Sequence, residues 1–458
     1  MSAPVMVRTA PSSRDRVARR RSRRSDTLEA TAWLVGVIAV ACMLASGSVD
    51  VTTAAGALIA AARVTGMAAS TLILVQLVLI ARVPLVEQTL GHDRAAVLHG
   101  RLGRLGFLII LAHVALTVLG YAASGDEGIV AQTWELMVGS VGPLFMAWAG
   151  LAVLIAVVVT SYAVVRSRWR YENWHAVHVF SYLAIGLSLP HQLTDGETFL
   201  TRGLAWWYWV VLWSLAVGAV LVFRVIRPLV RAARHRTTVA AVEPVGDGSV
   251  DLVLHGRALS RMKARPGQFV LLRFLAPGMW GQAHPYSLSR APLPDWWRVT
   301  VKPLGDASRA AAAVPVGTRV IVEGPLGIFT ADRARGGHLV LAGAGVGVTP
   351  LIGLLEDAPD GGRCTVIVRG STERDIPHLD EIRRFAAAKD ATLYVLTGPR
   401  GDGWAPAGRD AGIGHLIPRL ASSDVFACGP TGWVDALEAD ARAAGLARDS
   451  FHREVFAW

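Results

Sequence analysis

The sequence predicts a multi-domain protein in which a six-helix transmembrane bundle precedes a small antiparallel β-barrel and a Rossmann-like α/β domain. Three observations predict this organisation. Hydrophobic residues make up 52% of the 458 residues, and the mean hydropathy is +0.41, which is too apolar for a soluble enzyme of this size. Six apolar runs occur before residue 230. From Arg236 onward, short alternating segments replace them.

Charge and cysteine content exclude several classes of protein. The net charge of +11 comes mostly from arginines in the first 24 residues and beside the apolar runs, a pattern of membrane flanks that gives no indication of nucleic-acid binding. Cysteine occurs only as Cys42, Cys364 and Cys428, without a CxxC pair. The sequence therefore encodes neither a disulfide framework nor a cysteine-ligated iron–sulfur cluster.

Six runs approach the ~20 apolar residues that a helix needs to cross a bilayer core about 30 Å thick. They are residues 30–47, 55–82, 102–123, 141–165, 174–191 and 204–226, within a predicted domain of residues 30–230. Residues 1–29 form a basic arm, and we interpret the first run as a retained helix because no cleavage motif suits a secretory signal. We expect the arm to be a disordered determinant of topology. A site for anionic lipid is the alternative.

Arginines mark alternate connections between the runs, whereas the other connections are near-uncharged (47–54) or acidic (124–135 and 193–198). Arg and Lys favour the cytoplasmic side of a membrane. We therefore expect a multi-pass protein of the cell membrane, in contact with lipid, whose termini and C-terminal domains are cytoplasmic. The third and fifth helices then run from cytoplasm to exterior.

Two rhythms divide the remainder of the chain. The first is a series of alternating segments separated by turn residues, which predicts a β-barrel over residues 236–332: Thr237–Val245, Ser249–His255, Gln268–Phe274, Trp297–Leu304 and Thr318–Glu323. The second is strand, Gly-rich turn, helix, then strand, which predicts a parallel α/β domain over residues 333–458. Its strands are Leu339–Ala342, Thr365–Arg369, Thr392–Leu396 and Asp424–Ala427.

Four histidines in the apolar runs form two pairs with similar spacing. His99 and His113 are 14 residues apart on the third run, and His178 and His191 are 13 apart on the fifth. At 3.6 residues per turn, 14 residues is about four turns, so His99 and His113 face the same way about 21 Å apart. Histidines are rare in membrane spans and are candidates for function there. Two such helices predict axial ligation of two stacked b-type haems.

Helix direction assigns the pairs. His99 and His178 lie at the cytoplasmic beginnings of their helices and are expected to hold the inner haem, whereas His113 and His191 hold the outer one. A spacing of 13 residues turns His191 away from His178, and we expect a kink at Pro190 to restore its facing. The alternative is that all four are interfacial histidines that bond backbone or lipid. His175 is a competing ligand, and we expect His92 to be solvated in its loop.

At these residues the sequence resembles the ferric reductase and NADPH oxidase superfamily. The segment Asp93-Arg94…His99…His113 is similar to its third helix, and Trp174…His178…Tyr182…His191 is similar to its fifth. The resemblance implies bis-histidine haem ligation at the four positions. With the C-terminal half, it covers almost the whole chain beyond the basic arm.

The barrel segment carries a flavin signature. Pro266-Gly-Gln-Phe269 and His284-Pro285-Tyr286-Ser287-Leu288-Ser289 are similar to the FAD-binding motifs of the ferredoxin reductase superfamily. Tyr286 then provides the aromatic ring against the flavin, and the Ser287 hydroxyl lies near N5, the atom that takes the hydride. Gly305 and Ser308 stand where the family places its pyrophosphate loop. The alternative is that residues 284–289 are a plain strand.

A second glycine-rich loop predicts a dinucleotide site. Gly343, Gly345, Gly347, Thr349 and Pro350 follow a strand and precede a helical run. The loop lies between Gly324-Pro-Leu-Gly327 and Cys428-Gly429-Pro430, and these three elements occur in that order in the reductase family. The resemblance places Cys428 beside the nicotinamide. A buried inert cysteine is the alternative.

Arg369, Ser371 and Arg374 follow the second strand of this domain, where the adenosine 2′-position is read. A hydroxyl and two guanidiniums favour the 2′-phosphate of NADPH over NADH. The chain stops at Glu454-Val-Phe-Ala-Trp458. The family places a terminal aromatic over the flavin, and Glu454 then helps to position the nicotinamide. Trp458 as a core residue of the last strand is the alternative.

Taken together, the residues predict a transmembrane oxidoreductase that moves electrons from cytoplasmic NAD(P)H through FAD and two b-type haems to an exterior acceptor. Either O₂, giving superoxide, or a ferric chelate is consistent with the sequence. Two alternatives stay open: a membrane electron-transfer subunit that serves a partner protein, and a membrane-anchored flavin reductase without haem. Acidic residues of the outer connections either attract a cation or solubilise the surface: Asp126, Glu127, Glu135, Asp195 and Glu197.

Overall fold

The computed structural model describes residues 13–45, 50–126, 128–139, 142–162, 168–169, 171–194, 203–246, 248–335, 337–408 and 412–455. The chain divides into two compact units. One, the helical unit, comprises residues 23–86 and 93–224. The other, the reductase unit, consists mainly of residues 225–458 and the short segment 87–92, and the division also assigns residues 1–22 to it.

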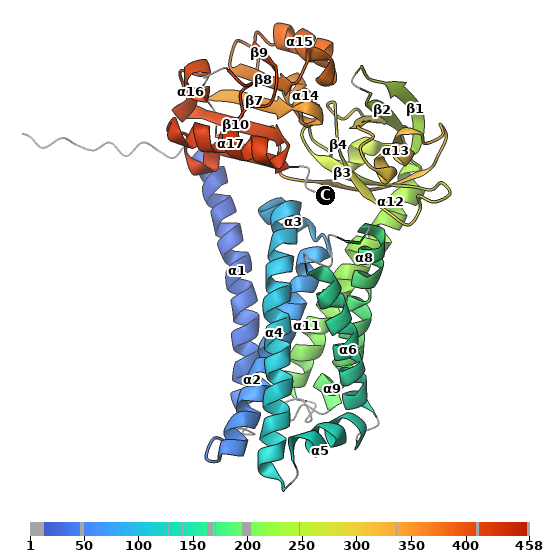
Figure 1. Cartoon of the computed structure of the whole chain (residues 1–458), viewed down its shortest axis with the longest axis vertical. Coiled ribbons are helices and arrows are strands. Elements are labelled where there is room, and N and C mark those ends of the chain that lie inside the picture. Colours follow the sequence, from blue (N-terminus) through green and yellow to red (C-terminus); the bar gives the residue numbers. More distant parts are fainter. Residues whose placement is uncertain are drawn as a thin grey trace, which may run out of the picture. The chain divides into compact units, whose positions relative to one another are not determined.

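Among the described residues, five helices are long and apolar enough to cross a membrane, within the ranges 23–45, 54–80, 92–124, 143–161 and 204–235. They correspond to α1 (Ser13–Ala45), α2 (Ala54–Ile80), α4 (His92–Ser124), α6 (Pro143–Ser161), and α11 (Leu204–Val220), which continues through the π-helix Leu221–Ile226 into α12 (Arg227–His235). Shorter elements are α3 (Pro84–Leu90), α5 (Ile129–Trp134) and the π-helix Glu135–Gly139. Figure 1 shows α2, α4 and α11 running alongside one another.

The fifth expected span does not form one long helix. It is divided into α8 (Tyr171–Val179) and α9 (Ser181–Thr194). At the break, the Phe180 amide donates to the Val177 carbonyl at 3.0 Å, a tight turn in place of the regular α-helical bond. α9 continues through Pro190, so the expected kink at Pro190 stays a prediction. The interruption between His178 and His191 shortens both pieces, and the expected sixth long span is therefore not confirmed within the described residues.

The expectation of a disordered basic arm was also wrong from Ser13 onward, because α1 begins there. Its first part is rich in Arg, which is a good helix former. Helical propensity thus extends the first span by several turns beyond its apolar part.

Apolar side chains lie both inside and outside the helical unit. Its core contains Met67, Leu74, Trp209 and Trp213, packed between α2 and α11. Large apolar side chains are also exposed along the helices, for example Leu108 at 60% and Leu215 at 66%. In water this exposure would be unfavourable, whereas lipid tails accommodate it. The helical unit is thus a membrane domain.

The first part of the reductase unit consists of two three-stranded antiparallel sheets. Their orders are β1-β2-β5 and β4-β3-β6, with β1 (Thr238–Pro244), β2 (Val250–His255), β3 (Phe269–Phe274), β4 (His284–Ser287), β5 (Trp296–Val301) and β6 (Val320–Leu326). Both sheets contribute to one core, which includes Leu252, Val270, Leu272 and Val299. The predicted strands are confirmed, but the described residues form two sheets joined by isolated bridges rather than one closed barrel.

The second part contains a five-stranded parallel sheet of order β11-β10-β7-β8-β9. The strands are β7 (His338–Ala344), β8 (Cys364–Gly370), β9 (Thr392–Thr397), β10 (Ser423–Gly429) and β11 (Phe451–Val455). The helices are α13 (Asp306–Ala312) in the first part and, here, α14 (Thr349–Glu356), α15 (Leu379–Ala388), α16 (Ile413–Leu416) and α17 (Thr431–Ala443). The predicted parallel domain is confirmed, and the sheet order creates a switch point between β7 and β10.

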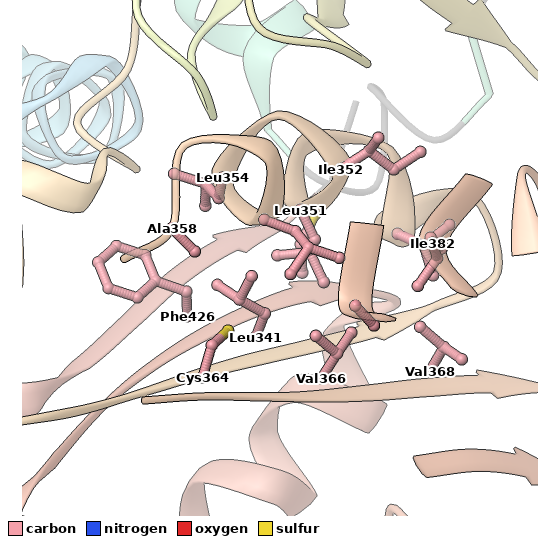
Figure 2. Packing of buried hydrophobic residues seen from close by; sticks show 14 of the residues in the cluster. Leu341, Leu351, Ile352, Leu354, Ala358, Cys364, Val366, Val368, Ile382 and Phe426 are labelled. Carbon is pink, nitrogen blue, oxygen red and sulfur yellow. The ribbon is translucent and has the colours of Figure 1, made fainter. Parts of the chain in front are cut away.

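Apolar residues cover both faces of this sheet, as a parallel sheet requires. On one face, α14 and α15 pack on the strands through Leu351 and Ile382. Figure 2 shows Leu351 and Leu354 directed from α14 toward the strand residues Leu341 and Phe426. On the other face, α17 contributes Val434 and Leu437. This packing fixes the carboxyl ends of β7 and β10, where the glycine-rich loop begins.

The core position of Cys364 gives a testable consequence. Burial raises the pKa of its thiol to about 12, above the value of about 8.5 for an unfolded cysteine. The stabilisation from a neutral thiol is therefore fully present below about pH 8.5 and is lost as the pH rises toward 12. At pH 8.5 we expect iodoacetamide to leave Cys364 unmodified in the folded chain and to modify it after unfolding in SDS, as measured by peptide mass spectrometry. Equal labelling before and after unfolding would contradict this core position.

Candidate functional site

Three predicted catalytic residues meet where the two parts of the reductase unit join. Cys428 on β10 is the register partner of Glu454 on β11. The Ser287 hydroxyl, at the end of β4, donates to Glu454 Oε1 at 3.0 Å. Ser287 and Glu454 are 5% and 6% exposed, and Cys428 is fully buried. A carboxylate, a hydroxyl and a thiol thus share one buried location.

The glycine-rich loop approaches the same location. A Cβ atom at Gly347 would lie 2.3 Å from the Cys428 carbonyl oxygen and 2.7 Å from Gly429 Cα, so only glycine fits. Gly345 has a φ of +54°, in the left-handed region. Gly343 pairs with Cys428 in the register of β7 and β10. The predicted loop and Cys428-Gly429-Pro430 are therefore in direct contact at the sheet's switch point, where α/β proteins bind ligands.

Thr349 and Pro350 anchor the end of this loop. The Thr349 hydroxyl donates to the Val346 carbonyl at 2.9 Å, and Pro350 occupies the first turn of α14. Both side chains are buried. These two side chains therefore support the loop from the protein interior. The backbone N–H groups of the loop are the groups suited to contact phosphate.

Arg369 lies differently from the other residues predicted to read the 2′-position. Its guanidinium donates to the Gly370, Gly398 and Pro399 carbonyls, and burial lowers the pKa of that guanidinium. These bonds join the turns that follow β8 and β9. Ser371 and Arg374 are exposed in the adjoining turn. The contacts of Arg369 favour a role in shaping this turn, whereas a phosphate role for the three residues stays a prediction.

The flavin motif forms β4 and the residues directly after it. Leu288 and Ser289 are fully buried. Tyr286 packs edge-on against Phe274 with ring centroids 6.5 Å apart, and burial raises the pKa of its phenol. His284 Nε2 lies 2.9 Å from Gln282 Oε1, and Pro285 separates His284 from Tyr286 within the strand.

Ser308 closes the predicted pyrophosphate loop upon itself. Its hydroxyl accepts from the Leu304 and Gly305 amides, each at 2.9 Å, and donates to the Gly305 carbonyl at 3.0 Å. Two of the backbone N–H groups in this loop are therefore already paired with a side chain. The prediction that Gly305 and Ser308 hold pyrophosphate stays a prediction.

In the helical unit, His99 and His178 lie close together. Their ring centroids are 6.1 Å apart at an interplanar angle of 75°. Metal–imidazole bonds of about 2 Å each are compatible with centroids about 6 Å apart in a two-histidine site. The proximity agrees with the expected inner pair.

Ser161, on α6, orients His178. The Ser161 hydroxyl donates to the Val157 carbonyl at 2.7 Å, so its lone pairs face Trp174 Nε1 at 3.2 Å and His178 Nδ1 at 3.4 Å. Trp174 also stacks on the His178 ring, with centroids 5.0 Å apart. With Nδ1 as the donor, His178 retains the Nε2 lone pair for a metal.

His113 is also held by a hydrogen bond at Nδ1, in this case with the backbone of α2. Its Nδ1 lies 2.7 Å from the Ala62 carbonyl oxygen, which selects the tautomer with a lone pair on Nε2. Gly66 gives the ring space, because a Cβ there would lie 2.9 Å from both Cε1 and Nδ1 of His113. His191 lies within electrostatic range of His113. Sequence reasoning did not identify Ser161, Ala62 or Gly66.

The four histidines fit haem iron in their donor chemistry. A porphyrin supplies four nitrogens, so two imidazoles complete the coordination. Within the described residues, the buried Nδ1 atoms of His99 and His191 have no hydrogen-bond partner. The donor set therefore fits haem by its chemistry, with two imidazoles for each iron.

His92 is not solvated, contrary to expectation. Its side chain is 12% exposed and its Nδ1 lies 3.0 Å from Glu87 Oε1. The ring packs edge-on against Phe269 of β3, with centroids 5.9 Å apart. The Arg333 guanidinium also donates to the Gln88 carbonyl at 2.9 Å. The segment 87–92 is therefore fixed on the flavin part of the reductase unit, which a sequence position between two apolar runs did not indicate.

Four of the predicted residues lie outside the described residues: Glu127, Asp195, Glu197 and Trp458. The Trp458 prediction and most of the acidic outer positions therefore stay predictions.

Comparison with known protein families gives a match within the helical part of the chain. Residues 65–189 match the family described as ferric reductase like transmembrane component. The match includes His99, His113 and His178 and ends two residues before His191. This chain carries a ferric reductase-like transmembrane component.

The curated relatives of this chain include a ferredoxin reductase component and a flavohemoprotein. The chain is 27% identical over 231 residues to the ferredoxin reductase component of a Rhodococcus rhodochrous 3-ketosteroid-9-alpha-monooxygenase, covering 48% of this chain and 64% of that protein. It is 29% identical over 236 residues to a Deinococcus radiodurans flavohemoprotein, covering 47% and 55%. The chain thus spans between about half and two thirds of these relatives. The similarity supports a ferric reductase-like component fused to a ferredoxin-reductase-type FAD/NAD module.

A solved structure resembles about half of the chain. The FAD/NAD-binding domain of a Vibrio cholerae nitric oxide dioxygenase has a TM-score of 0.41 and 22% identity, covering 49% of this chain and 99% of that domain.

The contact at Gly347 gives a test of the predicted dinucleotide site. Gly347→Ala places a methyl group against the Cys428 carbonyl and displaces the loop. We expect NADPH to bind at least about tenfold more weakly, a loss of roughly 1.4 kcal/mol, in fluorescence titration of the purified full chain. Gly246→Ala is the control, since a Cβ at Gly246 meets open space. Unchanged binding in the Gly347 variant would exclude this loop from the dinucleotide site.

Proposed function

We propose that this protein is a multi-pass oxidoreductase of the cell membrane that moves electrons from cytoplasmic NAD(P)H, with NADPH preferred, through FAD and two b-type haems to an exterior acceptor. The observation that carries the proposal is the approach of His99 to His178 between apolar helices, in a chain that also contains a reductase unit. When bound, FAD takes a hydride and releases single electrons, and haem iron carries one electron at a time. The chain's own residues position these groups.

At the reductase site, the side chains have distinct tasks. Glu454 accepts a hydrogen bond from the Ser287 hydroxyl and so fixes the position of that hydroxyl within the flavin motif. The register of β10 and β11 places Cys428 next to Glu454, and Gly347 allows the dinucleotide loop to reach the same backbone. Because all three side chains are buried, water is kept away from a transferring hydride.

In the helices, the proposed ligands are His99 with His178 for the inner haem and His113 with His191 for the outer haem. The bonds of His113 to the Ala62 carbonyl and of His178 to Ser161 support this role, because metal-ligating histidines donate their second ring nitrogen to a protein oxygen. Both O₂ and a ferric chelate remain candidate acceptors. Transfer to a partner protein is the second candidate function, and the relatives that are components of multi-protein monooxygenases favour it.

Two activity assays separate these functions. The purified chain in detergent is supplied with NADPH, and cytochrome c reduction sensitive to superoxide dismutase is compared with reduction of a ferric chelate. Rapid turnover in either assay identifies a small acceptor and argues against an obligatory partner protein. Slow turnover in both, with haem that is fully reduced by NADPH, supports the partner-protein function.

Removal of single histidines tests the haem assignment. His99→Ala and His113→Ala each delete one ligand of a different pair, so we expect each variant to retain about half of the haem per chain in pyridine haemochrome assays and to change the reduced-minus-oxidised spectrum. His415→Ala, at an exposed histidine of α16, serves as the control. Wild-type protein without b-type bands, or unchanged bands in the combined His113→Ala and His178→Ala variant, would exclude the proposed haem sites.

Gly66→Ala gives a subtler test of the same site. Its methyl group displaces the His113 ring from the Ala62 carbonyl, because a Cβ at position 66 would lie only 2.9 Å from Nδ1 and Cε1 of that ring. We expect the haem to be retained but its midpoint potential to shift, since the hydrogen bond at Nδ1 sets the basicity of the imidazole. Redox titration followed by visible absorbance measures this. An unaltered titration curve would show that the Ala62 bond does not tune an iron ligand.

A further inference from the structure

A buried polar network joins the flavin part of the reductase unit to α15 of the parallel domain. Its members come from β2, β5, the end of the flavin motif, and the beginning of α15: Asp251, Ser289, Arg298, Thr300, His378 and Glu381. Ser289 is fully buried, and Asp251, Thr300 and Glu381 are 4%, 6% and 8% exposed. Of these residues, only Ser289 belongs to the predicted flavin motif.

Arg298 connects the two parts directly. Its Nη2 donates to the Ser289 carbonyl at 2.6 Å and to Glu381 Oε2 at 2.8 Å. Its Nε donates to the Ser289 hydroxyl at 3.2 Å. The backbone amide of Ser289 in turn donates to the Arg298 carbonyl at 2.9 Å. One planar guanidinium therefore fixes the last residue of the flavin motif against α15, with a fork geometry that an ammonium group does not reproduce.

His378 completes the network between two carboxylates. Its Nε2 lies 3.1 Å from Asp251 Oδ1 and its Nδ1 lies 3.4 Å from Glu381 Oε2. The Thr300 hydroxyl donates to Asp251 at 2.7 Å. Each ring nitrogen of His378 thus faces one of the two buried carboxylates. His378 adopts a φ of +59°, an uncommon backbone conformation for a non-glycine residue that its surroundings hold in place.

A second contact fixes the same stretch of chain. The Ala291 amide donates to Glu356 Oε2 at 3.0 Å, and Arg290 Nε lies 3.5 Å from Glu356 Oε1. Glu356 is the last residue of α14, the helix that follows the glycine-rich loop. The residues immediately after the flavin motif are therefore attached to both helices on this face of the parallel domain.

We propose that Arg298 is a positioning residue that sets the distance between the flavin motif and the dinucleotide loop, and thereby the rate of hydride transfer. This inference rests on the proposed function. Buried charges add little stability compared with apolar packing, but they specify geometry when every partner is satisfied. Hydride transfer needs its reacting atoms within a narrow range, and a displacement of about 1 Å costs on the order of 10²-fold in rate.

The experiment compares variants of the full chain loaded with FAD. Arg298→Met removes the charge and both connections, whereas Arg298→Lys keeps the charge without the fork. Arg383→Met, on the exposed side of α15 where Arg383 pairs with Glu373 and Asp380, is the matched control. Anaerobic stopped-flow mixing with NADPH follows the loss of flavin absorbance, and the dependence on NADPH concentration separates binding from transfer.

We expect the limiting rate of flavin reduction to fall at least about tenfold in Arg298→Met and to recover only partly in Arg298→Lys, with NADPH affinity within about twofold of wild type. Arg383→Met should match wild type. If Arg298→Met fails to retain FAD, Arg298→Lys and Glu381→Gln decide by the same measurement. Variants that keep FAD and are reduced at the wild-type rate would overturn the positioning role. A wild-type chain that NADPH does not reduce would instead overturn the proposed function.

Discussion

The hydrogen bond from Ser287 to Glu454 is the constraint on which the reductase site depends. It joins residues 167 positions apart in the chain. Because the Glu454 carboxylate is buried away from water, it needs a hydrogen-bond donor from the protein, and the Ser287 hydroxyl provides one. Without such a donor, the burial of Glu454 would carry a large desolvation cost. Its formation requires β4 and β11 to meet, and the register of β11 with β10 then brings Cys428 to the same location. The meeting of the flavin strand and the parallel sheet is therefore part of the fold itself.

The strands and the glycine-rich loop were predictable because their signals are local. Alternation of side chains and the grouping of Gly343, Gly345 and Gly347 in one turn specify local structure before any tertiary contact forms. The break at Phe180 and the division of the barrel into two sheets were not predictable. Both depend on backbone hydrogen bonds that tertiary packing determines, and local sequence does not. For Arg369, the sequence indicates only a positive charge at the end of a strand. Only the structure places that charge on backbone carbonyls.

In the helices, spacing predicted the approach of His99 to His178 but not how the histidine rings are held. The approach of His99 and His178 follows from their positions on two helices, whereas the tautomer of His113 depends on the Ala62 carbonyl of another helix. That contact requires α2 to carry glycine at position 66. A glycine in an apolar run is common in membrane helices, so it carried no signal in one sequence. A histidine that is supported from a neighbouring helix is nevertheless a stronger candidate ligand than its spacing alone indicates.

The segment 87–92 belongs to the reductase unit, although it lies in the sequence between two parts of the helical unit. Its contacts are with the flavin part: His92 with Phe269 and the Gln88 carbonyl with Arg333. Phe269 is the register partner of Ser287, so the segment packs on the strand next to the predicted flavin motif. His92 is also the first residue of α4, the helix that carries His99 and His113. The reductase unit is thus attached to the helical unit before α4 as well as after α11.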